Sequence, residues 1–443
     1  MRVVIIGGNS AGNTAARTLL RHDPGADIHV VDRNSKTPYA GCSMKRLIAG
    51  DIIDWRLLLV GRNEPEHGLN RLGGWEAMEI KRAEREVLIA GNEGTRSLPY
   101  DRLILASGAA PEQIPGAAIS SRTFFFKSLE NAVALNRFIE EHRPADMVVV
   151  GGGPAGVGIA LALQRRGVRC RLIDEHDHPL AWLPPELGVM IRDRLIASGI
   201  QFLGGFHTTG IDDSRSSVGV SGSGGQAANA AGAICVMGWR PDTTLAVASG
   251  IRLGRLGGIA VDASLVTSDD RIFAAGDCAE TRHGITRRPC RGWGAVNAVR
   301  QGRTLGLKLA GKRATAPLMF NTIITGDGML QAATTGLNPL DQDTSNQRYL
   351  RATTLFPSPP PAMKYTPPTL PKLGISLLFD PAGGRLLGVQ AAGEGAADTV
   401  RLAAPALYHG ATLEDVLSYD PGYTPELGPV WHPLLMACRR ALG

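Results

Sequence analysis

Of the six cysteines in this chain of 443 residues, Cys42 has the surroundings of a reactive thiol. It precedes a segment, 43–48, whose pattern predicts a short helix, and that segment carries Lys45 and Arg46. The ionised thiolate is the nucleophilic form of cysteine, and a helix N-terminus with nearby cations favours it. Cys42 is therefore a candidate reactive centre, with a buried structural cysteine as the alternative. The two cations either select an anionic substrate or solvate one face of the helix.

Four of the other cysteines are expected to be packing residues. Cys170 and Cys235 lie in apolar stretches, Cys438 lies near the last residue, and Cys278 adjoins a further motif, whereas Cys290 has no assigned role. Widely spaced cysteines in a reducing compartment behave mostly as small apolar residues. No Cys-x-x-Cys pair and no His/Cys cluster with zinc-ligand spacing occurs, so the sequence predicts no metal site.

A glycine-rich turn before Cys42 is the first element that could position a cofactor. The segments 2–6 and 28–31 predict buried strands, 13–21 predicts the helix between them, and Asp32 ends the second strand. In such a unit the glycines allow a tight turn, the helix N-terminus faces a pyrophosphate, and the acid binds the adenosine ribose. Asn9 replaces the usual middle glycine, so an ordinary strand-to-helix turn stays the alternative. The predicted binding residues are Gly7, Gly8, Asn9, Ser10, Ala11, Gly12, Asp32 and Arg33.

A second unit of the same kind begins at residue 147. The apolar stretch 147–150 predicts a strand, a glycine turn follows, and the next predicted strand, 170–173, ends in an acid. An acid at that place favours a free ribose 2′-hydroxyl over a 2′-phosphate, so NADH is expected rather than NADPH. The predicted binding residues are Gly151, Gly153, Gly156 and Asp174.

Three further segments follow in chain order. The strand in 100–109 ends in small residues, Gly238 begins a Gly-Trp-Arg-Pro-Asp run, and the strand in 271–280 ends in Gly-Asp. With the two glycine turns, these segments resemble the pyridine nucleotide–disulfide oxidoreductase superfamily over essentially the whole chain. The resemblance implies FAD in the first unit and a nicotinamide nucleotide in the second. The resemblance also implies six further cofactor-binding residues, which are Ala106, Ser107, Gly108, Gly238, Gly276 and Asp277.

The fold implied by the resemblance is α/β, with two interleaved Rossmann-like domains for FAD and NAD(P) and an α+β C-terminal dimerisation domain. The FAD-binding domain is expected at 1–112 and 248–318, the NAD(H)-binding domain at 113–247, and the dimerisation domain at 319–443.

Smaller features of the fold are predicted from the local pattern. In the last domain, 375–379 and 386–391 predict a β-hairpin, and 396–408 predicts a helix with a kink at Pro405. The segments 214–232 and 357–371 are expected to be surface loops.

The same resemblance gives Cys42 the role of a single redox cysteine, because no second cysteine follows it four or five residues later. The single-cysteine branch contains coenzyme A disulfide reductases, CoA-dependent persulfide reductases, and NADH oxidases and peroxidases. The last two carry a histidine where this chain has Ser10. Similarity to the coenzyme A disulfide reductases makes Tyr365 and Tyr419 candidates for protonating the departing thiolate, with packing as the alternative. The expected substrate-binding residues are Ser10, Tyr39, Ser43, Lys45, Arg46 and Tyr423.

These features predict an enzyme that reduces a small-molecule disulfide or persulfide with NADH, through a mixed disulfide at Cys42, with coenzyme A as the candidate thiol. The alternatives are an NADH oxidase or peroxidase, a flavoprotein that reduces an electron-transfer protein, and a redox sensor with its own substrate. Pro154 and Gly158 replace an aromatic residue and a glutamate that the family usually has beside the nicotinamide. The expectation is therefore either a loosely bound nucleotide or an unusual electron donor.

Composition and charge exclude several classes of protein. The formal net charge is +6 and the basic residues are scattered, which favours a small anionic ligand over a nucleic acid. No apolar run approaches the roughly 18 residues that span a bilayer, and the first residues lack the pattern of a signal peptide. We therefore expect a cytoplasmic protein without nucleic-acid or membrane partners. The resemblance implies a homodimer in which the C-terminal domain completes the partner's active site.

Overall fold

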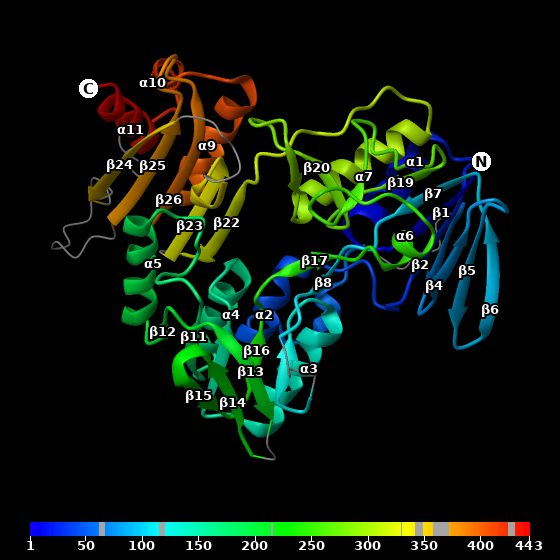
Figure 1. Ribbon diagram of the computed structural model, residues 1–443, viewed down its shortest axis with the longest axis horizontal. Coiled ribbons are helices and arrows are strands. Elements are labelled where there is room, and N and C mark those ends of the chain that lie inside the picture. Colours follow the sequence, from blue (N-terminus) through cyan, green and yellow to red (C-terminus); the bar gives the residue numbers. More distant parts are fainter. Residues whose placement is uncertain are drawn as a thin grey trace.

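The computed structural model describes residues 1–61, 67–114, 120–213, 216–328, 330–341, 349–357, 372–423 and 430–443. Three lobes are visible in Figure 1, and each contains a five-stranded sheet. Two of these sheets are parallel throughout and the third is antiparallel. This is the α/β class with two Rossmann-like units that the sequence predicts.

The first lobe is built on a parallel sheet whose last strand comes from a distant part of the chain. Helix α1 (Ser10–His22) packs along α7 (Ala295–Leu309), and this close contact requires glycine at 302, where a Cβ would overlap the carbonyl oxygen of Ala11. The strands in sheet order are β19 (Ile272–Ala274), β7 (Arg102–Leu105), β1 (Arg2–Ile6), β2 (Asp27–Asp32) and β3 (Leu69–Gly73).

The second lobe repeats the parallel arrangement with its own strands and helices. The strands in sheet order are β12 (Gln201–Leu203), β11 (Arg169–Ile173), β10 (Asp146–Val150), β16 (Ala233–Cys235) and β9 (Thr123–Phe125). The helices are α3 (Leu129–His142), α4 (Pro154–Arg165) and α5 (Pro185–Ala197). The central strands β7 and β1 of the first lobe and β10 and β16 of the second are almost entirely apolar and buried, as expected for parallel strands covered on both faces.

Each nucleotide-type lobe also carries an antiparallel three-stranded sheet. In the first lobe it consists of β4 (Glu76–Lys81), β5 (Glu86–Gly91) and β6 (Gly94–Pro99). In the second it consists of β13 (Thr208–Asp213), β14 (Val218–Gly222) and β15 (Ala227–Ala230).

The second of these sheets corrects the prediction that 214–232 is a loop. The side chains of Val218, Val220, Ala228 and Ala230 are buried against the lobe, and they alternate with glycine and polar residues. Small residues at alternate positions are enough for a half-buried strand, but they give a weak sequence signal.

The third lobe contains an antiparallel sheet with helices packed on it. The predicted hairpin is confirmed, with 380–385 between its strands, and the predicted helix is α9 (Ala396–His409), which contains Pro405. Pro357, expected in a loop, ends a strand instead, and 358–371 lies outside the described residues. The strands in sheet order are β22 (Ile323–Asp327), β23 (Leu330–Gly336), β26 (Leu386–Ala392), β25 (Lys372–Phe379) and β24 (Leu350–Pro357). Two further helices are α10 (Leu413–Leu417) and α11 (Pro433–Leu442).

The chain passes between the first two lobes twice, at neighbouring points. Strand β8 (Ala109–Pro111) leaves the first lobe and pairs with β17 (Trp239–Pro241), on which the chain returns. After β17 come α6 (Thr244–Ala248), β18 (Ile259–Ala260), β20 (Ala279–Arg282) and β21 (Pro289–Arg291).

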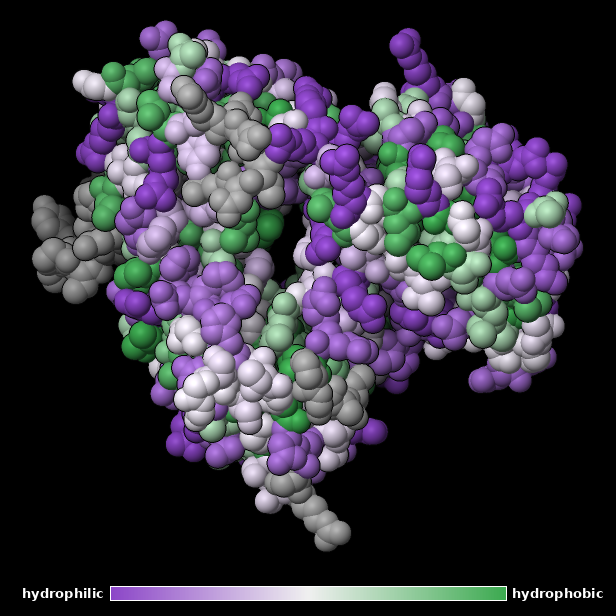
Figure 2. All heavy atoms as spheres, viewed as in Figure 1, coloured by the Kyte–Doolittle hydropathy of each residue, from purple (hydrophilic) through white to green (hydrophobic). Residues whose placement is uncertain are grey.

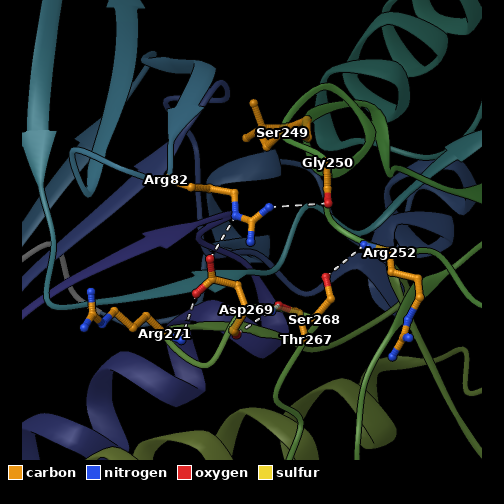
Figure 3. Close-up of polar contacts among 9 residues, drawn as sticks. Arg82, Ser249, Gly250, Arg252, Thr267, Ser268, Asp269 and Arg271 are labelled. Atoms are coloured by element: carbon orange, nitrogen blue, oxygen red, sulfur yellow. Dashed lines mark hydrogen bonds and ion pairs between the residues drawn. The ribbon is translucent and has the colours of Figure 1, made fainter.

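Where the returning chain joins the first lobe, a polar network links three loops (Figure 3). The guanidinium of Arg82 donates to Asp269 at 2.8 Å and to the carbonyl of Gly250 at 3.5 Å, while Asp269 also accepts from the backbone N–H of Arg271. Asp269 and Arg271 precede β19 whereas the glycine turn follows β1, and these strands are parallel in one sheet, so the contacts lie at the opposite edge of the sheet from the turn. We therefore assign them a structural role.

Candidate active site

The first glycine turn has the geometry of a dinucleotide site. Gly7 has a φ of 102°, and a Cβ on Gly12 would overlap the carbonyl oxygen of Gly7, so both positions require glycine. Asp32 ends β2 beside the turn, where its carboxylate accepts from the backbone N–H of Gly8 at 2.7 Å and of Asn34 at 2.8 Å. Burial raises the pKa of Asp32, although the two N–H groups oppose that shift.

The predicted contacts from three separate segments meet at the same edge of the first sheet. Strands β19, β7 and β1 are neighbours, and their carboxyl ends lead into Gly276, Ala106 and Gly7. The hydroxyl of Ser107 donates to the carbonyl of Asp242 at 2.7 Å, which ties this edge to the returning chain. Ligands of doubly wound folds bind at this edge of the sheet.

Gln301 provides an independent test of whether this edge fits FAD. Its side chain is fully buried, and its Oε1 accepts from the N–H of Gly276 at 2.7 Å. Its Nε2 has no hydrogen-bond partner among the described residues. A buried donor without a partner is costly, so a ligand with acceptor atoms is expected nearby. Together with the glycine turn and Asp277, this donor fits FAD.

The second glycine turn has the same hydrogen bond as the first, from a backbone N–H of the turn to the acid at the end of the next strand. Gly151 has a φ of 112°, and the carboxylate of Asp174 accepts from the N–H of Gly152 at 2.5 Å. The carbonyl of Gly152 in turn accepts from the N–H of Leu180 at 2.9 Å. Asp174 also accepts twice from His176, a residue that the sequence reasoning did not select. The turn at the N-terminus of α4 therefore fits a second dinucleotide.

Cys42 lies in a 3₁₀ turn, Gly41–Ser43, directly before α2 (Met44–Ala49). The loop that carries it is fixed to the first glycine turn, because the N–H of Tyr39 donates to Oδ1 of Asn9 at 3.3 Å. The Cys42 side chain is exposed. Asn9, which replaces a glycine of the usual pattern, thus has a structural role in placing the cysteine loop beside the cofactor edge.

The other five thiols, all of them described, differ from Cys42 in exposure. Burial raises the pKa of Cys170, Cys235 and Cys438 to about 12. It also raises the pKa of Cys278, and it raises that of the half-buried Cys290 to about 12, with smaller contributions from nearby acids. These five thiols stay protonated at neutral pH, so none of them competes as a nucleophile.

Two predicted substrate residues next to Cys42 face different surroundings. Lys45 lies between α2 and α4, where a Cβ on Gly158 would be 3.1 Å from its Cδ. It lines a small cavity of about 40 Å³ together with Arg165. Arg46 is exposed and pairs with Asp51 at 3.8 Å. Gly158 therefore leaves room for the Lys45 stem where the usual pattern has a glutamate.

Of the predicted tyrosines that the structure describes, Tyr39 lies on the Cys42 loop, whereas Tyr419 and Tyr423 follow α10 in the third lobe. Tyr419 is half-buried against the core of the third lobe, and burial, followed by the charge of Asp415, raises its pKa. Tyr423 is 56% exposed, and Tyr365 lies outside the described residues. Figure 1 shows α10, which precedes Tyr419, well separated from α2. Tyr39 is buried, which raises its pKa to about 12.

Lys127 is a residue of this site that the sequence reasoning missed. It lies between β9 and α3, and its ammonium is 3.3 Å from the carboxylate of Asp277 and 4.8 Å from the ring centre of Trp239. The sequence signal for Lys127 is its place directly before a helix-capping pair, Ser128 and Asn131. The capping pair fixes the backbone at the start of α3, and the Lys127 side chain extends from that backbone.

Neither a group of candidate metal ligands nor a membrane-spanning helix occurs in the described ranges. No three His, Cys, Asp or Glu side chains lie together there as candidate metal ligands. No helix of those ranges is both long enough and apolar enough to cross a bilayer.

Two dinucleotide-binding units, with the cysteine loop between them in the sequence, are typical of an oxidoreductase that binds two nucleotide cofactors. The pattern of the family described as pyridine nucleotide-disulphide oxidoreductase matches residues 1–302, and the chain belongs to that family.

Known relatives cover the chain from end to end. The NAD(P)H coenzyme A polysulfide/persulfide reductase of Pyrococcus horikoshii is 27% identical over 99% of this chain and 98% of its own length. The NADH oxidase of Methanocaldococcus jannaschii is 25% identical over 100% of this chain and 99% of its own. Among solved structures, an NAD-dependent persulfide reductase from A. fulgidus superposes with a TM-score of 0.93, at 26% identity, over 100% of this chain and 83% of that one.

Proposed function

We propose that this protein is an FAD-dependent, NAD(P)H-driven reductase of a small-molecule disulfide or persulfide, with Cys42 as its redox cysteine. The observation that carries the proposal is the exposed Cys42 thiol on a loop that hydrogen-bonds to the first glycine turn through Asn9. The reductases of Pyrococcus horikoshii and A. fulgidus support the same class of substrate, and coenzyme A is the candidate thiol.

The chemistry at Cys42 is thiol–disulfide exchange. Its thiolate attacks one sulfur of the substrate, so that a Cys42–sulfur bond forms and the substrate S–S bond breaks. The displaced thiolate leaves after taking up a proton. The mixed disulfide at Cys42 then requires two electrons and a proton to release the second thiol, and NAD(P)H is their source. Ser43, Lys45 and Arg46 adjoin the thiol and are the proposed contacts for an anionic substrate.

FAD, when bound, supplies the two-electron chemistry that links a nicotinamide to a disulfide. The residues that would hold it are the glycine turn, Asp32 at the adenosine ribose, and Asp277 at the carboxyl end of β19. Gln301 orients Gly276 and offers its free amide hydrogens. Lys127 balances the charge of Asp277.

The nucleotide at the second turn is proposed to be NADH rather than NADPH. Asp174 is only 14% exposed, and it lies where a ribose 2′-phosphate would meet its charge. Glu175 follows it with an exposed carboxylate. Two acids at this strand end disfavour a phosphate by like-charge repulsion.

We further propose a homodimer in which Tyr365, Tyr419 and Tyr423 approach Cys42 of the partner subunit. Support comes from apolar side chains at the surface, since Ile53 is 91% and Leu57 70% exposed near the cysteine loop. Trp431, in the third lobe, is 51% exposed. The domain boundaries proposed for this arrangement remain 1–112, 113–247, 248–318 and 319–443.

The test compares Cys42→Ser with the parent enzyme, both loaded with FAD, for NADH-dependent reduction of coenzyme A disulfide. The variant is expected to lose at least about 100-fold in turnover, because serine cannot form the mixed disulfide. Cys290→Ser, which removes a half-buried thiol, is the matched control and should keep its activity. Full activity in Cys42→Ser removes the proposed mechanism.

NADH oxidase activity is the second candidate, since the relative from Methanocaldococcus jannaschii bears that name. Oxygen uptake with NADH and without any disulfide measures it directly. Uptake that exceeds disulfide reduction under air would favour the oxidase assignment.

A further inference from the structure

The helix that follows Cys42 is packed into the core of the second lobe rather than that of the first. Leu47 and Ile48 of α2 are buried in one hydrophobic cluster with Leu135 of α3 and Leu163 of α4. The apolar side chains of β1 and β7 belong to other clusters. Helix α2 accordingly contacts α3 and α4 (Figure 1). The position of the cysteine segment therefore depends on the second lobe, although the chain reaches it from the first.

The C-terminal end of α2 is capped by Arg166, the residue directly after α4. Its Nη1 lies 3.2 Å from the carbonyl oxygens of both Leu47 and Ile48. The last carbonyls of a helix have no partner inside that helix, and a cation beside them also faces the negative end of the helix dipole. Arg166 thus supplies from another lobe the donor that the end of α2 lacks.

The same guanidinium is fixed on its other side by α3. Nη1 of Arg166 is 3.2 Å from Oδ1 of Asn136, and Nη2 is 3.3 Å from the carboxylate of Glu140. The Arg166 side chain is only 22% exposed. Because the guanidinium is planar and its partners surround it, the contact holds α2, α3 and the end of α4 in one arrangement.

The neighbouring Arg165 makes a second and weaker attachment. Its guanidinium is 3.3 Å from the carboxylate of Asp51, just after α2, and 3.3 Å from that of Asp327 in the third lobe. The Arg165 side chain is 49% exposed, and exposed ion pairs contribute little. We therefore assign the attachment of α2 chiefly to Arg166.

Helix α4 joins this attachment to the second glycine turn, because it begins at Pro154, directly after Gly153 of the turn. We propose that Arg166 is a positioning residue of the reductase, which keeps α2, and with it the Cys42 turn, in the place from which the thiol reacts. The inference rests on the proposed role of Cys42. Arg166 acts through the backbone of α2, at the opposite end of that helix from the thiol.

The test combines hydrogen exchange at the end of α2 with turnover of the FAD-loaded protein. The N–H groups of Asp51 and Ile52 donate to the carbonyl of Arg46 at 3.0 and 3.2 Å, so their exchange, followed by mass spectrometry, reports the opening of this end. In Arg166→Met exchange should become about tenfold faster. NADH-dependent turnover of coenzyme A disulfide should fall about tenfold, with KM within about twofold of the parent. A tenfold change corresponds to about 1.4 kcal/mol, which is comparable with the net contribution of a hydrogen bond.

Two further variants separate positioning from a general loss of stability. Arg166→Lys keeps a cation at the helix end and should bring both readouts to within about threefold of the parent. Arg171→Met is the matched control, because Arg171 is also partly buried in the second lobe and bonds to an acid and a backbone carbonyl. Those partners are Asp146 of β10 and Asn229 of β15, so this variant should leave exchange and turnover unchanged.

Parent-like turnover in Arg166→Met overturns the inference while the proposed function stands. A loss of turnover without faster exchange also overturns it, because the effect would not pass through α2. Equal losses in Arg171→Met overturn it too, since any weakening of the second lobe would then act alike. If Cys42→Ser keeps full activity, the proposed function fails first and the inference fails with it.

Discussion

The ammonium of Lys127 lies 3.3 Å from the carboxylate of Asp277, so that a residue before α3 reaches the loop after β19. Less than a third of either side chain is exposed. The second carboxylate oxygen of Asp277 accepts from the N–H of Gly294 at 3.2 Å, and the ring of Trp239 lies beneath the ammonium. Asp277 is therefore held in place before any cofactor arrives, at the edge where the anionic FAD is expected.

Replacing Lys127 by methionine should weaken FAD binding by about tenfold, because a half-buried carboxylate then faces the cofactor without its counter-charge. Lys127→Arg should stay within about threefold of the parent, since it keeps the charge. The measurement is titration of the apoprotein with FAD. Arg137→Met, on the exposed face of α3, is the control. Parent-like affinity in Lys127→Met would show that Asp277 needs no counter-charge.

Thiol labelling provides a test of Cys42 that does not depend on turnover. The native protein should react rapidly at one of its six cysteines with a disulfide reagent at pH 7.5, because burial raises the pKa of the other five. In Cys42→Ser the rapid phase should disappear, and all thiols that remain should react only after denaturation. A rapid phase that survives the substitution would place the reactive thiol elsewhere.

The sequence predicted the two glycine turns because each depends on neighbours in the chain. Within each strand–turn–helix unit two glycines lie in contact, Gly7 with Gly12 in the first unit and Gly151 with Gly156 in the second. The acid at the end of the next strand is part of the same local pattern. The segment around Cys42 was found because its residue types and position match a known family.

Other contacts could not be predicted, because their partners are distant in the sequence or depend on side-chain orientation. Lys127 and Asp277 are 150 residues apart, and no local pattern links them. The contact between His176 and Asp174 depends on a ring orientation that spacing alone does not determine. Strands β14 and β15 were missed because glycine, serine and alanine obscure the alternation of buried and exposed positions.

A buried histidine predicts how stability depends on pH. His283 is 3% exposed, and its Nδ1 accepts from the N–H of Ile285 at 3.1 Å. Burial lowers its pKa from 6.5 to about 4, although the carbonyl of Gly336 opposes the shift. The unfolded chain therefore binds a proton between pH 6.5 and 4 that the folded chain does not, so stability falls as the pH falls through that range. The total loss should approach about 3 kcal/mol.

Urea unfolding at several pH values between 4 and 7 measures this loss. His283→Gln should unfold more easily at pH 7 but should show a flatter pH dependence across the same range. The carboxylates with lowered pKa values, among them Asp101 and Asp415, lose their contribution only below about pH 4, and thus do not mimic the effect. An equally steep dependence in the variant would assign the loss to another group.

The network of Figure 3 predicts a purely structural effect. Burial alone would raise the pKa of Asp269, but the N–H of Arg271 and the guanidinium of Arg82 outweigh it, and the net pKa is lowered. Asp269→Asn should therefore destabilise the protein by about 1–2 kcal/mol at pH 7, because it removes the charged acceptor that joins two loops. The difference from the parent should shrink below pH 4, as the aspartate itself becomes protonated.

The matched control is Asp270→Asn, which changes the adjacent acid without touching the contacts of Arg82. FAD affinity should be the same in both variants, because the network lies away from the glycine turn. If Asp269→Asn lowered FAD affinity as strongly as Lys127→Met, the network would belong to the cofactor site rather than to the joint between the returning chain and β4. Equal stability of the two aspartate variants would mean that the ion pair with Arg82 contributes nothing beyond solvation.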